Sequence, residues 1–184
     1  MRRRAKILIA VGSIIAIAVV ATFLWVLVPR VYRKVVRIGI TQIVDHPALN
    51  AIRDGFIDAM AEAGYVEGKN VIYDIQNAQG DIATASTIAR KFVSEKVDLI
   101  LSIATPTSQA AVNVTTTIPI VFSAVTDPVG AGLVKSLESS GNNVTGMSDL
   151  TPVERQIELI KTILPKAKAV GTLYNAAEAN SVLT

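Results

Sequence analysis

The segment Ala104–Gln109, with the sequence ATPTSQ, places hydroxyl groups and a proline where a helix is expected to begin. Thr105 suits the N-cap and Pro106 the first helical position, because proline lacks an amide hydrogen that a helix start leaves unpaired. The N–H groups of Thr107 and Ser108 are then free at the helix end that carries a partial positive charge. Such an end favours an anion such as a carboxylate, although Thr-Pro is equally typical of a plain helix start.

A second loop, AVTDPVG, places Thr126 and Asp127 directly before Pro128. Asp127 is suited to accept a hydrogen bond from the ammonium group of a ligand. The alternative is a turn carboxylate that faces water, since Asp-Pro favours turns. An anion site beside a carboxylate suits a zwitterion, and an amino acid is the simplest example.

Two further loops carry polar groups after apolar runs. The loop TQIVDHP contains Thr41 and His46, and the loop YNAAEANS contains Asn175 and Glu178. His46 precedes Pro47, so its alternative role is to cap or flank a helix. The polar residues of YNAAEANS are equally suited to cap a helix that follows them.

Catalytic and metal-binding patterns are missing from the sequence. The chain has no cysteine and one histidine, which excludes disulfides, thiolate metal sites, cysteine nucleophiles and sites built from several histidines. It also lacks the glycine-rich phosphate-binding motifs and the nucleophile-elbow motif. We therefore expect a binding protein rather than an enzyme, with no cofactor and no metal.

The elements that position these loops alternate between β-branched runs and helical periodicity. We expect strands at 35–40, 70–76, 97–104 and 118–125, and helices at 47–64, from Asp81 to about residue 92, and at 106–114. Gly64 is expected to end the first helix, and Asp81 to cap the second. The apolar side of the second helix is expected to contain Ile82, Ala85, Ile88, Ala89 and Phe92. This order predicts an α/β fold with a parallel sheet flanked by helices, whose ligands bind beyond the carboxyl ends of the strands.

The C-terminal part begins a second alternation. After a turn-rich break at 139–143, the pattern predicts a crossover strand at 144–150, a helix at 151–164 and a strand at 169–175. Thr151 and Glu154 form a capping box at the start of that helix. A single strand and helix cannot make a second sheet. We therefore expect residues 35–143 to form lobe one, and residues 144–184 the hinge crossing and the start of a truncated lobe two.

The N-terminal part is apolar and basic. Ile7–Val28 is a run of 22 residues without a charge, and as a helix it would span roughly 33 Å, the thickness of a membrane core. We expect residues 1–34 to be an uncleaved membrane anchor; the alternative is a signal peptide cut after AIA at 16–18. From residue 38 on, the chain contains ten basic and 15 acidic residues. The resulting net charge of −5 argues against nucleic-acid binding.

Five ordered blocks of the sequence resemble a known family. They are HPALNAIRDGFIDAMAEAGYVEGKNV, DLILSIATPTSQAA, IPIVFSAVTDPVGAGLVKSL, NNVTGMSDLTPVERQIELIK and VGTLYNAAEANS. The chain from about residue 35 onward resembles the ABC-transporter substrate-binding proteins of the tryptophan/tyrosine-type uptake family. Many relatives are anchored through a lipid-modified cysteine, which this chain lacks.

The resemblance implies a type I periplasmic-binding fold, in which two Rossmann-like lobes enclose a ligand and are joined by a three-segment hinge. It also implies a membrane permease and a cytoplasmic ATPase as partners, with the binding domain outside the cytoplasm on a single-pass anchor. The cleft residues expected by position are Thr41, His46, Thr105, Ser108, Thr126, Asp127, Asn175 and Glu178. An alternative is the extracytoplasmic sensing domain of a membrane signalling protein.

Overall fold

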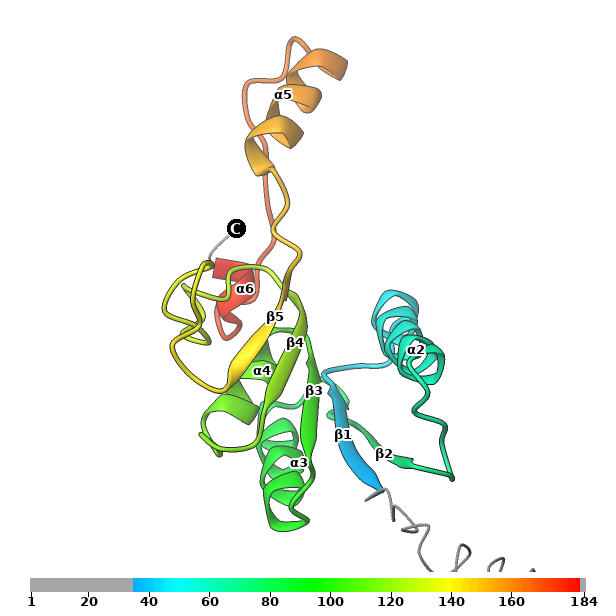
Figure 1. Ribbon diagram of the computed structural model, residues 1–184. Helices are drawn as coiled ribbons and strands as arrows, with labels where there is room; N and C mark the ends of the chain where they lie inside the picture. Colours follow the sequence, from blue (N-terminus) through cyan, green and yellow to red (C-terminus); the bar gives the residue numbers. More distant parts are fainter. Residues whose placement is uncertain (1–34, 183–184) are drawn as a thin grey trace, which may run out of the picture. The chain divides into compact units, whose positions relative to one another are not determined.

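The computed structural model describes residues 35–182, which contain a five-stranded parallel sheet in the order β2-β1-β3-β4-β5 (Figure 1). The strands are β1 (Val36–Gln42), β2 (Val71–Asn77), β3 (Leu99–Ile103), β4 (Ile120–Val125) and β5 (Val144–Ser148). Each neighbouring pair is parallel. The expected parallel α/β sheet is therefore confirmed, and the segment expected to cross between lobes also supplies its fifth strand.

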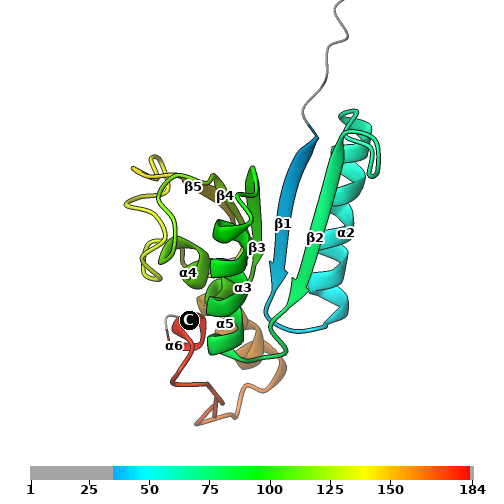
Figure 2. The same cartoon turned by 90° about the horizontal axis from the view of Figure 1, so that it is seen from below.

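Helices cover both faces of the sheet. They are α2 (Pro47–Glu62), α3 (Ile82–Ser94), α4 (Thr105–Val112), α5 (Val153–Ile163) and α6 (Ala179–Val182). Helix α2 lies on one face, and α3 and α4 lie on the other (Figure 2). This arrangement follows from the right-handed crossovers that join parallel strands.

Each face of the sheet has its own core, because successive side chains of a strand point to opposite sides. On the α2 side, Ile38, Ile40 and Leu101 pack against the apolar side of that helix. On the other side, the Phe92 ring of α3 packs with Ile100 and other strand residues. Gly39 makes room for that ring, since a Cβ at residue 39 would lie 2.7 Å from it. The loops that follow the strands are therefore attached to a sheet that is packed on both faces.

The start of α3 and the end of α2 follow the sequence pattern. Asp81 caps α3, with its Oδ1 accepting from the Thr84 amide at 2.6 Å. Gly64, just after α2, has a φ of 90°, the conformation that glycine adopts most readily. Four of the five residues expected on the apolar side of α3 are buried, but Ile82 is 46% exposed. Ile82 is the first residue of the helix, where the sheet no longer covers it.

The capping box predicted at residue 151 is wrong. Helix α5 begins at Val153, with Pro152 as its N-cap, and no described side chain caps it. Pro152 has a ψ of 80°, outside the helical range, so the helix starts later than predicted. The Val153 amide donates to the Thr151 carbonyl oxygen at 2.9 Å, and Glu154 becomes the second helical residue.

The strand predicted at 169–175 does not form within the described range 35–182. Val170 to Tyr174 lie in loop conformation, and Leu173 is 100% exposed. A strand needs a neighbour to pair its amide and carbonyl groups. No described strand lies beside this segment, so its apolar residues stay in water.

The described residues were examined for a helix that could span a membrane. In residues 35–182, no helix combines the length and the apolar character that a membrane span requires. The predicted anchor, residues 1–34 with the apolar run at 7–28, lies outside the described residues.

Candidate functional site

The strand order reverses between β1 and β3, and their carboxyl ends meet at the same edge of the sheet. From β1 the chain goes to β2 on one side, and from β3 it goes to β4 on the other. In open α/β sheets such a reversal opens a crevice that receives ligands. The loops after β1 and β3 are therefore the first place to look for a site.

Ala104 makes the sharp turn from β3 into α4. Its amide still donates to the Ser123 carbonyl oxygen of β4 at 2.9 Å, but its φ of 85° and ψ of 157° are rare for any residue with a side chain. Strained residues of this kind cost about 1–3 kcal/mol and concentrate at functional sites. Ala104 is also the N-cap of α4, which corrects the prediction that Thr105 caps it; no described side chain caps this helix. Thr105 and Pro106 are its first two residues.

Ser108 holds the start of α4 on the sheet. Its buried Oγ lies 2.8 Å from the Ser102 Oγ and donates to the Ala104 carbonyl oxygen at 2.9 Å. Its amide also donates to that carbonyl oxygen, at 3.1 Å. The sequence predicted a free Ser108 amide, and this prediction is wrong because the amide makes the first hydrogen bond of the helix. Its role in this structure is to position α4.

Two buried threonine hydroxyls have no such partner. Thr41 is 1% exposed and Thr105 is 2% exposed, and neither Oγ1 has a hydrogen bond to any described residue. Thr41 lies beside Ser102 in the β1–β3 register, on the sheet face that α4 covers. A buried, unpaired hydroxyl costs about 1–3 kcal/mol. The hydroxyls of Thr41 and Thr105, near the start of α4, can therefore each donate a hydrogen bond to a ligand.

His46 acts as the N-cap of α2. Its exposed Nδ1 accepts from the Ala48 amide at 3.2 Å, which is the capping role left open by the sequence. The loop before it is held by Gln42, whose Nε2 donates to the Val44 carbonyl oxygen at 3.0 Å and to the Asn50 Oδ1 at 2.9 Å. Gln42 is buried, and the sequence reasoning did not single it out. Gln42 could have been found from the sequence, because it is a polar residue at the end of an apolar strand.

Asp127 closes the turn that follows β4. Its Oδ1 accepts from the amides of Val129 and Gly130 at 3.0 and 2.9 Å. Within the described residues, Oδ2 makes no hydrogen bond. The carbonyl oxygen of Thr126 accepts from the Ser148 Oγ at 2.7 Å, which ties β4 to β5. Asp127 thus has one oxygen used in the turn and a second left for another donor.

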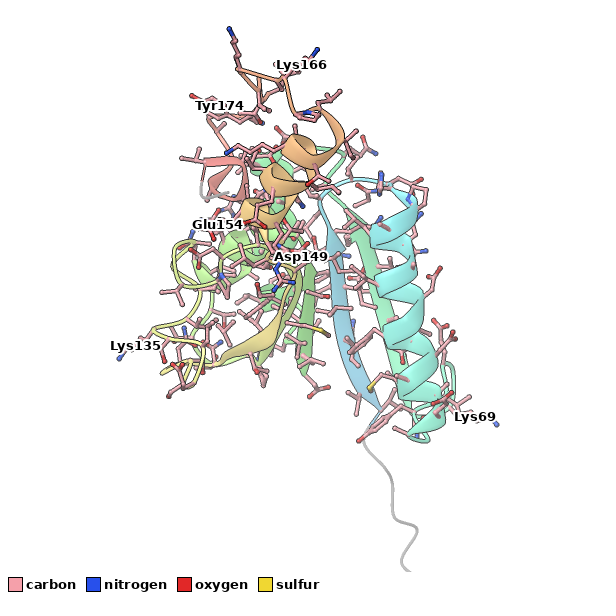
Figure 3. All side chains as sticks on the ribbon, turned by 90° about the horizontal axis from the view of Figure 1, so that it is seen from above. Lys69, Lys135, Asp149, Glu154, Lys166 and Tyr174 are labelled. Atoms are coloured by element: carbon pink, nitrogen blue, oxygen red, sulfur yellow. The ribbon has the colours of Figure 1, made fainter. Side chains whose placement is uncertain are left out.

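Asn175 and Glu178 bind each other in an exposed turn. The Asn175 Nδ2 donates to the Glu178 Oε1 at 2.9 Å, and the Asn175 Oδ1 accepts from the Ala177 amide at 3.0 Å. Figure 3 shows Tyr174 and Lys166 on the same segment, apart from the sheet. A cleft of about 860 Å³ between α5, residues 170–174 and α6 is lined by Thr126 but by none of the other seven predicted residues. The structure groups Thr41, Thr105 and Ser108, and leaves Asn175 and Glu178 in a separate turn.

Comparison with known proteins identifies the fold and the family. The family model described as ABC transporter substrate binding protein matches residues 37–184. The tyrosine-binding protein of Clostridioides difficile (strain R20291) is 53% identical over 149 residues, which are 81% of this chain and 43% of that protein.

Two solved structures are also similar to this chain. The conserved domain protein of Vibrio cholerae is 57% identical, with a TM-score of 0.79, over 82% of this chain and 51% of that one. The ABC domain of Streptococcus pneumoniae, solved in complex with L-Trp, is 41% identical, with a TM-score of 0.77, over 80% and 50%. This chain therefore spans about half the length of the relatives that it matches.

The resemblance drawn from the sequence is confirmed by these matches. The parallel five-stranded sheet is consistent with the type I periplasmic-binding fold that the resemblance implied. The family consists of binding proteins rather than enzymes. Since its model matches 37–184, the chain belongs to the family of ABC transporter substrate-binding proteins.

Proposed function

We propose that this chain is the solute-binding component of an ABC importer and that its ligand is an amino acid. The observation that carries the proposal is the pair of buried, unpaired hydroxyls of Thr41 and Thr105 beside the start of α4. Family membership supplies the transport context. The site supplies the chemistry by which the ligand is held.

The ligand carboxylate is the group that fits the start of α4. The helix end carries a partial positive charge, and its first-turn N–H groups lack intrahelical acceptors. The hydroxyls of Thr41 and Thr105 add two donors. Both are covered in this conformation, so binding requires their side chains to rotate toward the ligand. Hydrogen bonds to a charged group then recover the cost of leaving these donors unpaired.

The ligand ammonium group is proposed to meet Asp127. The Oδ1 of Asp127 is held by two amides of the turn, which fixes the direction of the carboxylate. Its Oδ2 is the oxygen proposed to accept from the ammonium group. We propose an aromatic amino acid because one relative is named for tyrosine and another was solved with L-Trp.

The proposed mechanism is hinge closure without covalent chemistry. The ligand bridges lobe one and a second lobe, of which the residues after β5 are proposed to form the start, and stabilises the closed form that docks on a permease. A cytoplasmic ATPase then drives transport. We also propose that the apolar run at 7–28 anchors the chain, with the binding domain outside the cytoplasm.

A thermal-shift screen of the protein against the twenty amino acids tests this proposal. A true ligand at 100 times its Kd adds about 2.7 kcal/mol to the free energy of unfolding, which is visible as a rise in Tm. We expect the largest rise with L-Tyr or L-Trp. The amides of the same amino acids, which lack the carboxylate charge, are the matched controls. A rise of equal size with acid and amide would contradict the carboxylate site.

A further inference from the structure

Ala104 joins β3 to α4 in a conformation that is nearly exclusive to glycine. Its φ of 85° is combined with a ψ of 157°, which lies outside the left-handed helical region that other residues occasionally adopt. A residue with a Cβ stays in such a conformation only where the surrounding structure fixes it. The groups that fix Ala104 therefore decide how α4 begins.

The Thr107 hydroxyl holds both peptide groups that meet at Ala104. Its Oγ1 lies 2.7 Å from the Ile103 carbonyl oxygen and 2.9 Å from the Ala104 carbonyl oxygen, and its hydrogen is shared between them. The φ and ψ of Ala104 describe the relative orientation of these two peptide planes. Thr107 is fully buried, so water does not compete for the hydroxyl. One side chain thus holds both sides of the strained turn.

Three further hydrogen bonds support the same turn. The Ala104 amide donates to the Ser123 carbonyl oxygen of β4 at 2.9 Å. The Ser108 Oγ and the Ser108 amide donate to the Ala104 carbonyl oxygen at 2.9 and 3.1 Å. With Thr107, three donors meet a carbonyl oxygen that has two lone pairs. Only the Thr107 hydroxyl reaches the carbonyl oxygens on both sides of Ala104.

The turn at Ala104 sets the direction of the donors proposed to meet the ligand carboxylate. Pro106 has no amide hydrogen, and within residues 35–182 the Thr105 and Thr107 amides have no acceptor. The buried Thr105 Oγ1 is unpaired as well. A change of φ and ψ at Ala104 would rotate the peptide plane that carries the Thr105 amide. The donors would then no longer point to one place.

We propose that Thr107 is a positioning residue for ligand binding, because its hydroxyl keeps Ala104 in the strained conformation that presents the Thr105 donors. This inference rests on the proposed function, since it concerns the same carboxylate site. Without the hydroxyl, the strain at Ala104 favours a relaxed turn in which the site is not formed. A ligand must then restore the strained turn, which lowers the apparent affinity.

A double-mutant cycle in the full chain, measured by calorimetric titration with L-Tyr and L-Trp, tests the proposal. Thr107→Val removes the hydroxyl at nearly constant shape, and Ala104→Gly supplies a residue that adopts the turn without strain. We expect Thr107→Val to raise the Kd about tenfold or more in the parent, but less than about threefold in the Ala104→Gly background. An equal rise in both backgrounds would overturn the proposal.

Two substitutions serve as controls for the hydroxyl. Thr107→Ser keeps the donor and is expected to recover most of the affinity. Thr87→Val removes a comparable hydrogen bond, from Thr87 Oγ1 to the Ala83 carbonyl oxygen at 3.0 Å, inside the regular helix α3. It is expected to leave the Kd unchanged in both backgrounds. A Kd for Thr107→Ser as high as that for Thr107→Val would contradict the role of the hydroxyl.

Thermal unfolding without ligand separates this proposal from the proposed function. Ala104→Gly relieves strain and is expected to raise Tm by about 2–4 °C, whereas Ala110→Gly, inside α4, is expected to lower it by a similar amount. Thr107→Val is expected to lower Tm at least as much in the Ala104→Gly background as in the parent, because relief of strain offsets part of the loss in the parent only.

These Tm values do not depend on a ligand. If no amino acid binds the parent, the proposed function fails, and the Tm values still decide whether the Thr107 hydroxyl holds a strained turn. A Tm for Ala104→Gly no higher than that of the parent would overturn the strained turn. So would a smaller effect of Thr107→Val on Tm in the Ala104→Gly background than in the parent.

Discussion

At the scale of single residues, the site is defined by which hydroxyls are satisfied. Ser102 and Ser108 bond each other, and the Thr107 Oγ1 donates to the Ile103 carbonyl oxygen at 2.7 Å. Thr41 and Thr105, in the same small region, have no described partner. The bonded hydroxyls hold α4 in place, and the unpaired ones remain as donors for a ligand.

Isosteric substitutions distinguish these two roles. Thr41→Val removes an unpaired buried hydroxyl, so the free energy of unfolding is expected to stay the same or to rise slightly. Ser108→Ala removes two hydrogen bonds and is expected to destabilise the fold by about 1–2 kcal/mol. Urea unfolding followed by circular dichroism measures both. A larger loss for Thr41→Val than for Ser108→Ala would contradict this assignment of roles.

Asp74 on β2 gives the fold a defined acid sensitivity. Burial raises the pKa of its carboxyl, but hydrogen bonds from Lys91 and Gln76 and the Lys91 charge outweigh burial and leave the pKa below its usual range. The Lys91 Nζ lies 2.5 Å from the Asp74 Oδ2. Since the pKa is lowered by folding, the stabilisation is present above the unfolded-state pKa and is lost as the pH falls through the folded-state pKa.

The expected result is that Asp74→Asn lowers stability at pH 7 and flattens the loss of stability below about pH 4. The effect should be modest and weaken with added salt, because the Lys91 side chain is 40% exposed. Unfolding curves from pH 3 to pH 7, in low and high salt, measure it. An unchanged acid profile in the variant would rule out this role for Asp74.

The sequence predicted the hydroxyls at this sheet edge but not their bonding. Whether Thr41 meets Ser102 depends on the register of β1 against β3, two segments about 60 residues apart. Ser108 was mispredicted for a local reason: its amide was expected to be free because the N-cap was placed at Thr105, one residue after the observed N-cap Ala104. The sequence pattern therefore identified these side chains, but their pairing depends on strand register and on the residue at which the helix begins.

At the scale of elements, the packing of α3 on the sheet depends on one missing side chain. The Phe92 ring lies over Gly39 of β1, where a Cβ would come within 2.7 Å of it. A ring is held there by the core around it, so it cannot move away cheaply. The contact explains why β1 carries a glycine in the middle of an apolar strand.

Two glycine-to-alanine substitutions are expected to act in opposite directions. Gly39→Ala overpacks the α3 interface and is expected to destabilise the fold by about 1–3 kcal/mol. Gly55→Ala, in a helix with open space around it, is expected to stabilise the fold by about 0.5–1 kcal/mol. Thermal unfolding of both variants provides the comparison. Destabilisation of similar size at both sites would mean that the Phe92 contact is not the cause.

The elements themselves were largely predictable. The sequence pattern predicted all five strands, with β5 as the crossover strand, and helices α2 to α5. The strands were visible as short apolar runs, and α2 and α3 as helices with one apolar side, whereas α4 was visible from the Thr-Pro pair at its start. The helix starts were less predictable, since proline limits its own φ but leaves its ψ open, as at Pro152. The segment 169–175 has a strand-like sequence, yet strand formation depends on a neighbour that sequence pattern does not reveal.

At the scale of the whole molecule, one sheet presents two unlike surfaces. Its carboxyl edge gathers unpaired donors beside α4, whereas its α2 face ends in an apolar groove. The first surface suits a small charged ligand. The chain spans about half the length of each relative. The proposed transport role therefore refers to the part of the binding site that this half contains.

The most direct test of the proposed function is calorimetric titration of the protein with L-Tyr and L-Trp, in the parent form and with Thr105→Val. We expect binding of at least one of them by the parent form, and a Kd about tenfold or more higher in the variant, with the free energy of unfolding preserved. Thr105→Ser, which keeps the hydroxyl, should retain most of the affinity. Equal affinity in Thr105→Val and the parent, or no binding by the parent, would contradict the carboxylate site at the start of α4.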